Sequence, residues 1–202
     1  LVALPLLAER LGVKSILVKD ESHRFGLKAY KGLGGSYALG QLLAEHLTVD
    51  IAEIDLTTVS DQLDKPLVFP TATAGNHGTG VAWAAQKMGQ KAVVYMPMGS
   101  PVASVERIRK LGAECIVTDV NYDDTVRLAS KTADENGWIL VQDTAWEGYE
   151  KIPTWISQGY MTMPDEAIEQ AQAMNSGEIT HVMLQAGVGS MAGGVLGYLV
   201  DK

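Results

Sequence analysis

The stretch Leu67-Val-Phe-Pro-Thr-Ala-Thr-Ala-Gly75-Asn-His-Gly-Thr-Gly80 joins a short apolar segment to a glycine-rich turn. A helical pattern begins at Asn76 and ends at Gly89, and a second apolar segment, Ala92–Pro97, follows it. A strand, a helix and a strand in this order are typical of a parallel sheet whose crossover connection is a helix. This stretch therefore predicts an α/β fold.

The same alternation of short apolar runs and amphipathic segments continues along the rest of the chain. Further strands are predicted at 15–20, 114–119, 138–143 and 181–186, and further helices at 29–46, 101–112, 122–136, 165–175 and 190–200. The apolar runs indicate strands that are buried on both faces. We therefore expect a two-lobed α/β protein with mostly parallel sheets covered by helices.

The composition is that of an ordinary globular chain of 202 residues, with 47% hydrophobic and 20% charged residues. Its net charge of -8 disfavours contact with the phosphates of nucleic acid, and no apolar run is long enough to cross a membrane. The single cysteine, Cys115, permits no internal disulfide, and the four scattered histidines offer no metal-ligand spacing. We expect a cytoplasmic protein without a structural metal and without nucleic acid or membrane as a partner.

The two ends of the chain predict that it is part of a longer one. The apolar run Leu1–Ala8 lacks both the basic start and the cleavage site of a signal peptide. At the other end, the chain stops at Lys202 inside what looks like a helix. We therefore expect a fragment that is truncated at its C-terminus.

Three glycine-rich segments lie at predicted strand-to-helix junctions, where open α/β sheets bind their ligands. In the first, Lys31 follows Tyr30 and precedes Gly32-Leu-Gly-Gly35. This run is a poor helix former, so we interpret its glycines as places where another group approaches closely. A lysine is usually a solvated helix residue, but a buried lysine with a lowered pKa is what a Schiff base with a carbonyl cofactor requires.

The second segment is Ala74-Gly-Asn76-His-Gly78, and it has two interpretations. Asn76 is either the cap of the following helix or a donor to a phenolate oxygen of a ligand. The third segment, Gly187-Val188-Gly189-Ser190-Met191, opens a helix, so its backbone N–H groups and the Ser190 hydroxyl are suited to hold a phosphate. A dinucleotide is disfavoured, because the chain ends before the acidic residue expected about 20 positions later.

Together, these segments resemble those of the fold-type II pyridoxal-phosphate enzymes, the group related to the tryptophan synthase β subunit. Within that group, Lys19–Leu27, Ala145-Trp-Glu-Gly-Tyr149 and Ile152-Pro-Thr-Trp-Ile-Ser-Gln-Gly-Tyr160 resemble the diaminopropionate ammonia-lyases more than the threonine dehydratases or cysteine synthases. The aromatic-rich segment 152–160 is the most specific match. The likeness extends over nearly the whole chain.

The resemblance implies pyridoxal 5'-phosphate as the cofactor, an amino acid as the substrate and a homodimer as the assembly. It implies a lyase that converts 2,3-diaminopropionate to pyruvate and ammonia by α,β-elimination. It also implies that residues 1–48 and 166–202 belong to the large domain, that 66–165 form the small α/β domain and that the acidic stretch 49–65 connects them. The implied site residues are Lys31 as the Schiff-base lysine, Tyr30 and Asn76 beside the cofactor, Gly187, Val188, Gly189, Ser190 and Met191 around its phosphate, and Asp143 and Tyr122 at the substrate.

One departure from the lyase pattern concerns the residue before Gly75. These lyases usually have an aspartate there, which is expected to take the α-proton of the D-isomer, whereas this chain has Ala74. We therefore expect a preference for the L-isomer. Three alternatives stay open: a serine or threonine dehydratase, a catalytically inactive cofactor-binding fragment, and a dinucleotide-binding redox domain.

Overall fold

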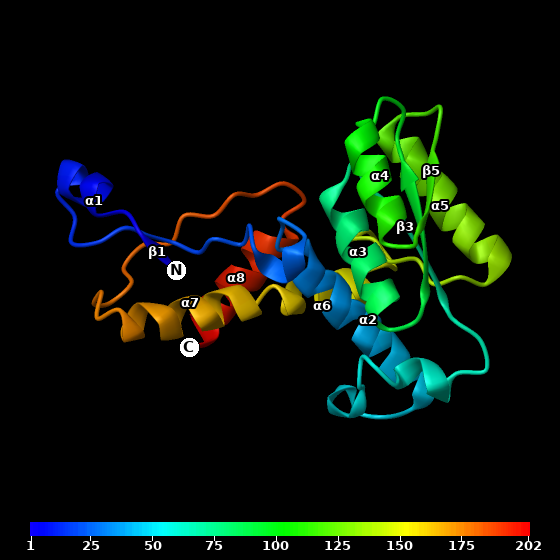
Figure 1. Cartoon of the computed structure of the whole chain (residues 1–202), viewed down its shortest axis with the longest axis horizontal. Coiled ribbons are helices and arrows are strands. Elements are labelled where there is room, and N and C mark those ends of the chain that lie inside the picture. The colour runs from blue at the N-terminus through cyan, green and yellow to red at the C-terminus, as the bar shows by residue number, and fades with distance from the viewer.

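The computed structural model describes residues 1–202, and its centre is a three-stranded parallel sheet in the order β3–β4–β5 (Figure 1). The strands are β3 (Val68–Ala72), β4 (Lys91–Met96) and β5 (Glu114–Val117). Helices α3 (Asn76–Lys87) and α4 (Val102–Lys110) form the two crossover connections. The α/β fold predicted from residues 67–97 is confirmed.

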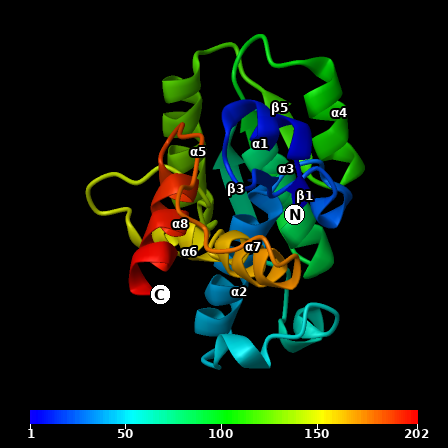
Figure 2. The same cartoon turned by 90° about the vertical axis from the view of Figure 1, so that its left-hand side faces the viewer.

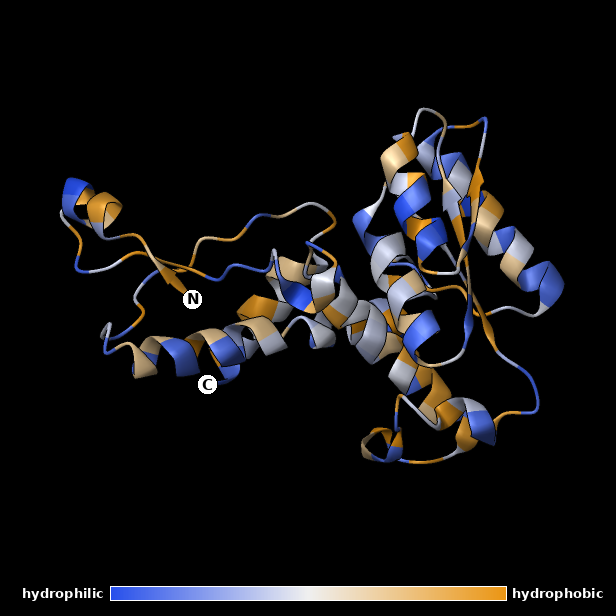
Figure 3. Cartoon of the chain, viewed as in Figure 1, coloured by the Kyte–Doolittle hydropathy of each residue, from blue (hydrophilic) through white to orange (hydrophobic).

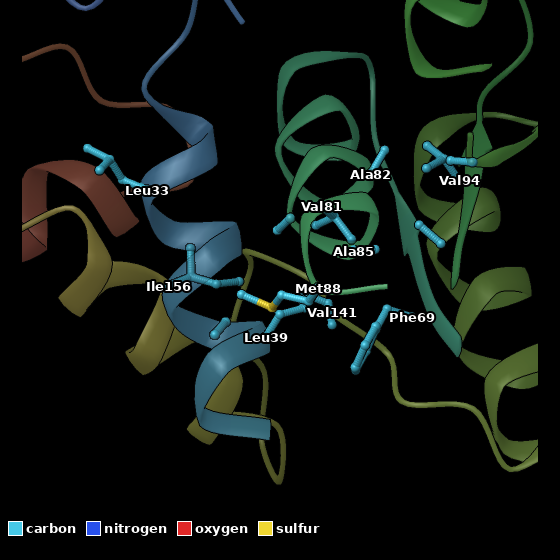
Figure 4. Packing of buried hydrophobic residues seen from close by; sticks show 14 of the residues in the cluster. Leu33, Leu39, Phe69, Val81, Ala82, Ala85, Met88, Val94, Val141 and Ile156 are labelled. Carbon is cyan, nitrogen blue, oxygen red and sulfur yellow. The ribbon is translucent and has the colours of Figure 1, made fainter. Parts of the chain in front are cut away.

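Helices cover both faces of this sheet. Successive residues of β4 point to opposite sides, so Val94 and Met96 join one apolar cluster while Val93 and Tyr95 join another. Figure 4 shows the first cluster, in which Leu39, Phe69 and Val81 pack together with Val94. The second cluster lies against α5 (Tyr122–Asn136). Figure 3 shows the matching pattern, with hydrophobic strands and with alternating colours along α4 and α5.

Residues 138–143 run beside β3 without forming a regular strand. The N–H groups of Ile139 and Val141 donate to the carbonyl oxygens of Val68 and Pro70 at 3.1 and 2.9 Å. Further along, the side-chain oxygen of Gln142 accepts from the N–H of Ala72 at 3.0 Å. A side chain thus replaces the backbone in the pairing, and the strand predicted at 138–143 is not formed.

Two helices connect the sheet to the rest of the chain (Figure 1). They are α2 (Lys31–Leu47) and α6 (Lys151–Gly159), which pack against each other, and α2 also packs against α3. The sequence patterns predicted α2 but not α6. Two 3-10 turns, Ile51–Glu53 and Val59–Gln62, lie in the predicted connection 49–65.

The remaining elements lie together on the side that faces the viewer in Figure 2. They are the antiparallel pair β1 (Val2–Ala3) and β2 (Leu17–Val18), with α1 (Pro5–Leu11), α7 (Thr162–Ala173) and α8 (Ser190–Asp201). A short 3-10 turn, Arg24–Gly26, precedes α2. The division into domains at 48, 66 and 165 stays a prediction.

The strand predicted at 181–186 is wrong. No backbone group of this segment is hydrogen-bonded to another part of the chain, and a strand without a neighbour leaves its N–H and C=O groups unpaired. Its apolar side chains are exposed, with Met183 at 89% and Val182 at 47%. The apolar run that predicted a buried strand therefore lies on the surface of this chain.

Candidate active site

Lys31 and Asp143 meet although they are 112 residues apart in the sequence. The Nζ atom of Lys31 lies 2.7 Å from Oδ2 of Asp143, and the two side chains are only 17% and 8% exposed. Lys31 is the first residue of α2, and Asp143 follows the extended segment beside β3. The structure thus brings together two of the predicted catalytic residues in a largely buried ion pair.

The glycines on either side of this pair explain how the lysine reaches it. A Cβ atom on Gly80 of α3 would lie 2.6 Å from the carbonyl oxygen of Lys31, and one on Gly35 would lie 3.0 Å from the backbone of Gly80. Side chains at these positions would push the two helices apart. The close approach predicted from the glycine-rich run is therefore made by α3, and it fixes Lys31 beside the 74–78 turn.

His77 lies against the same carboxylate. Its Nε2 is 2.9 Å from the carbonyl oxygen of Val141, and since a carbonyl only accepts, Nε2 carries the proton. Its Nδ1 faces Oδ2 of Asp143 at 3.8 Å and has no hydrogen-bond partner. Burial lowers the pKa of His77, so the imidazole is neutral at physiological pH.

The charge of Asp143 is set by opposing effects. Burial alone would raise the pKa of Asp143, but the charge and the hydrogen bond of the Lys31 ammonium oppose burial and hold this pKa below its ordinary value. The pair therefore carries one positive and one negative charge near neutral pH. A fixed carboxylate of this kind is suited to bind an amino group.

Tyr122 joins the site indirectly. Its hydroxyl accepts a hydrogen bond from Nε2 of Gln142 at 3.0 Å, and Gln142 immediately precedes Asp143. Burial, together with the charge of Asp143, raises the pKa of Tyr122, so the hydroxyl stays protonated. Tyr149 supports the same segment, since its hydroxyl donates to the carbonyl oxygen of Leu140 at 2.8 Å and accepts from the N–H of Gln142 at 2.9 Å.

The start of α8 lies beside the ion pair. The Ser190 hydroxyl donates to the backbone carbonyl of Asp143 at 2.6 Å. None of the backbone N–H groups from Gly187 to Ala192 donates to an acceptor in the chain, and a Cβ atom on Gly187 or Gly189 would meet no atom within 4 Å. Open, unpaired N–H groups at a helix start are suited to an anion such as a phosphate.

The other residues that were expected around the cofactor differ in their exposure and contacts. Val188 is exposed, and Met191 is buried in the main apolar cluster. Asn76 is exposed in the first turn of α3, where its side chain makes no hydrogen bond. The ring of Tyr30 lies 5.7 Å from Nζ of Lys31.

Sequence reasoning missed Tyr160. Its ring is fully buried, lies 5.6 Å from Nζ of Lys31 and meets Tyr30 edge to face. Burial raises the pKa of Tyr160 well above its ordinary value. Tyr160 ends the aromatic-rich segment 152–160, so the signal that marked the segment as specific could have pointed to it.

Three of the four buried side-chain polar atoms without a hydrogen-bond partner lie around the ion pair, and the fourth is Nε of Arg107. Nδ1 of His77, Oγ1 of Thr144 and the hydroxyl of Tyr160 are buried without a hydrogen-bond partner, and each belongs to a residue beside Lys31 or Asp143. Buried polar groups in native proteins are nearly always paired, so such a concentration indicates a place for a bound molecule. Together with the open start of α8, these residues fit pyridoxal phosphate, the cofactor that the resemblance implies.

No group of three or more His, Cys, Asp or Glu side chains is arranged to hold a metal ion. None of the helices combines the length and the apolar character that crossing a bilayer requires.

Comparison with known proteins places the chain among characterised sequences. The family model described as "Pyridoxal-phosphate dependent enzyme" matches residues 1–201. The chain is 61% identical over 201 residues to the diaminopropionate ammonia-lyase of Escherichia coli and 58% identical to that of Salmonella typhimurium, covering 100% and 97% of this chain. One solved structure is that of the Escherichia coli diaminopropionate ammonia lyase in complex with an aminoacrylate-PLP azomethine reaction intermediate. It is 61% identical and superposes with a TM-score of 0.90, and the superposition covers 98% of this chain and 50% of that one.

The lengths differ between this chain and these relatives. The chain spans about half the length of the curated relatives that it matches, since the alignments cover 50% of each. Lys31, Asp143 and the start of α8 all lie within the matched part.

Proposed function

The chain belongs to the family of pyridoxal-phosphate-dependent enzymes, and we propose that its protein is a lyase that releases ammonia from 2,3-diaminopropionate. The observation that carries this proposal is the buried pair of Lys31 and Asp143 at 2.7 Å, beside the open start of α8. It supplies an amine, a fixed carboxylate and an anion-binding helix start in one place. The 61% identity to the diaminopropionate ammonia-lyase of Escherichia coli supports the choice of substrate.

In this proposal, Lys31 holds the cofactor, and the N–H groups of residues 187–192 bind its phosphate. Asn76 donates to its phenolic oxygen, and Tyr30 lies beside it. When bound, pyridoxal phosphate supplies a ring that accepts the negative charge left at Cα of the substrate.

The other residues act on the substrate. The Lys31 amine removes the α-proton, because it is the basic group that the packing of α2 on α3 fixes at this point. Asp143 binds the cationic amino end of the substrate, and Tyr122 keeps Asp143 in place through Gln142. Loss of the β-amino group and hydrolysis then give pyruvate and ammonia.

The test measures pyruvate release from diaminopropionate, with serine and threonine as the competing substrates, on the complete native gene product. We expect diaminopropionate to react fastest, and Lys31→Ala to abolish the reaction while Lys28→Gln, at an exposed position, retains it. Faster turnover of serine or threonine would establish a dehydratase instead.

The attachment of the cofactor is tested separately. We expect borohydride reduction of the loaded protein to leave the cofactor mass on the peptide that carries Lys31. Cofactor mass on Lys28 or on any other lysine peptide would contradict the assignment.

The assembly and the compartment are also proposals. We expect a homodimer, as the resemblance implies, and sedimentation of the complete protein measures it. A cytoplasmic location is supported by the single, buried Cys115, and fractionation of the native cells tests it.

A further inference from the structure

The Lys31 ammonium is enclosed by more than its carboxylate partner. The rings of Tyr30 and Tyr160 lie with their centroids 5.7 and 5.6 Å from Nζ, within the distance of about 6 Å at which a cation is attracted to an aromatic ring. The two rings stand nearly perpendicular to each other, at 81°. Asp143 and these two tyrosines therefore form three walls around one ammonium group, and we call this set the ammonium subsite.

The position of the Tyr160 ring is fixed by close packing. A Cβ atom on Gly34, one helical turn after Lys31, would lie 2.7 Å from both Cε1 and Cζ of Tyr160. The carbon that carries the hydroxyl is thus held against the first turn of α2. Tyr160 cannot leave the subsite without disturbing the contact between α2 and α6.

The ammonium subsite has unused hydrogen-bonding capacity. The Tyr160 hydroxyl is buried without a partner, and Lys31 contacts only Oδ2 of the two carboxylate oxygens of Asp143. An ammonium group has three N–H donors, and a phenol oxygen and a carboxylate oxygen both accept. The subsite therefore offers acceptors that a second ammonium group could use.

In the proposed function, the Lys31 amine holds the cofactor. It is then no longer a free ammonium group beside Asp143, Tyr30 and Tyr160. Asp143 would then be a buried carboxylate without a close cation, which is unfavourable. We propose that Asp143, Tyr30 and Tyr160 form a subsite for primary ammonium groups, which Lys31 fills in this structure and which takes the second amino group of a diamino-acid substrate. This assignment of the substrate group rests on the proposed function.

The ammonium subsite would set specificity by charge. Serine carries a neutral hydroxyl where diaminopropionate carries an amino group, and a neutral group gains neither the ion pair with Asp143 nor the attraction of the rings. Tyr160 and Tyr30 thus become specificity residues beside Asp143.

The first experiment tests the subsite without cofactor and without turnover. In the complete protein carrying Lys31→Ala, n-propylammonium chloride is expected to raise the melting temperature more than potassium chloride at equal concentration, because the added cation replaces the lysine ammonium. Addition of Tyr160→Leu to this variant is expected to weaken the apparent affinity for n-propylammonium about tenfold. Equal stabilisation by both salts, or no effect of Tyr160→Leu, would overturn the subsite.

The second experiment uses the loaded enzyme. Tyr160→Leu is expected to raise KM for diaminopropionate about tenfold and to change KM for serine less than about twofold. Tyr160→Phe keeps the ring and removes only an unpaired hydroxyl, so it is expected to fold normally and to give a smaller increase. The control is Tyr95→Phe, because Tyr95 is buried on the face of the sheet that packs against α5.

The outcomes separate the two proposals. An equal rise in KM for both substrates in the Tyr160 variants would show that the ring has a merely structural role and would overturn the inference. Binding of n-propylammonium by Lys31→Ala without any turnover of diaminopropionate by the unmodified enzyme would overturn the proposed function and leave the ammonium subsite standing.

Discussion

At the start of α2, a Cβ atom on Gly34 would lie 2.7 Å from the ring of Tyr160, and one on Gly35 would lie 3.0 Å from the backbone of Gly80. At the start of α8, a Cβ atom on Gly187 or Gly189 would meet nothing within 4 Å. Both segments are rich in glycine and both begin a helix. In the first the glycines let helices pack closely, and in the second they keep the backbone N–H groups accessible.

Glycine-rich segments therefore have two different structural roles in the same site. Close packing at α2 holds the lysine in a fixed place, whereas the open start of α8 can receive an anion. The segment 71–80 combines both, because Gly78 and Gly80 are packed while Ala74 and Asn76 are exposed. Substitutions on the packed side and on the open side should therefore have different consequences.

The largest effect is expected on the open side of the 71–80 segment, at Ala74. If an aspartate here takes the α-proton of the D-isomer, Ala74→Asp should raise turnover of D-2,3-diaminopropionate by about 10²–10⁴-fold, the usual contribution of one positioned base. Turnover of the L-isomer should stay nearly unchanged, because Lys31 serves it. The measurement is pyruvate release from each enantiomer.

The matched control for Ala74→Asp is Ala145→Asp, which places the same charge in an exposed loop. It should not change the ratio of the two isomers. Equal turnover of both isomers by the unmodified protein would mean that another group, such as His77, takes the proton of the D-isomer.

The second prediction compares packed and open glycines directly. Gly34→Ala should lower the free energy of unfolding by about 1–3 kcal/mol, because the added methyl group overlaps Tyr160 and Ile156. Gly193→Ala, in α8 where an added Cβ meets nothing, should raise it by up to about 1 kcal/mol through helix propensity. Urea unfolding of both variants measures the difference, and a loss of similar size in both would remove the distinction between the two helix starts.

The third prediction concerns binding of the cofactor at α8. Gly189→Asp places a negative charge at the helix start that is proposed to hold the phosphate, so the affinity for pyridoxal phosphate should fall at least about tenfold. Gly197→Asp puts the same charge on the same helix away from its start and serves as the control. Titration of the cofactor-free proteins checks this, and unchanged affinity in Gly189→Asp would show that the phosphate binds elsewhere.

The sequence predicted the elements that local residue patterns mark. The sheet strands at 68–72 and 91–96 and the helix 122–136 follow from apolar runs and from helix-ending glycines such as Gly137. The strand at 181–186 was wrong, because apolar composition does not reveal whether a neighbouring strand is present. The helix 151–159 was not predicted, because it has only nine residues and contains Pro153, which usually interrupts a helical pattern.

The candidate site was predicted in part for a similar reason. Lys31 and Ser190 were predicted because each adjoins a glycine-rich turn, which is a feature of the local sequence, whereas the role of Asp143 came from the resemblance to the lyases. Tyr160 was missed because its place beside Lys31 depends on how α6 packs on α2, and that contact joins residues far apart in the chain. Which element packs against the glycines at 32–35 was equally invisible without the structure.

The smallest effect is expected from an ion-pair contact between α7 and the segment that precedes α2. Glu166 of α7 accepts hydrogen bonds from Arg24 at 2.9 and 2.6 Å and contacts Lys19 at 2.5 Å, which ties the segment before α2 to α7. The Arg24 bonds, with help from Lys19, lower the pKa of Glu166 from 4.5 to about 2. Since the folded pKa lies below the ordinary value, the stabilisation is present above about pH 4.5 and is lost as the pH falls towards 2.

The lowering of the Glu166 pKa from its ordinary value corresponds to at most about 3 kcal/mol of folding stability. Because part of the side chain is exposed to solvent, we expect the contacts of Glu166 to contribute about 1 kcal/mol. Glu166→Gln should therefore lower the free energy of unfolding by about 1 kcal/mol at pH 7, and the gap to the unmodified protein should narrow between pH 4.5 and 2. Urea unfolding across this pH range measures the gap, with Glu169→Gln on the same helix as the control. A gap that stays constant with pH would show that Glu166 stabilises the start of α2 through packing and not through its charge.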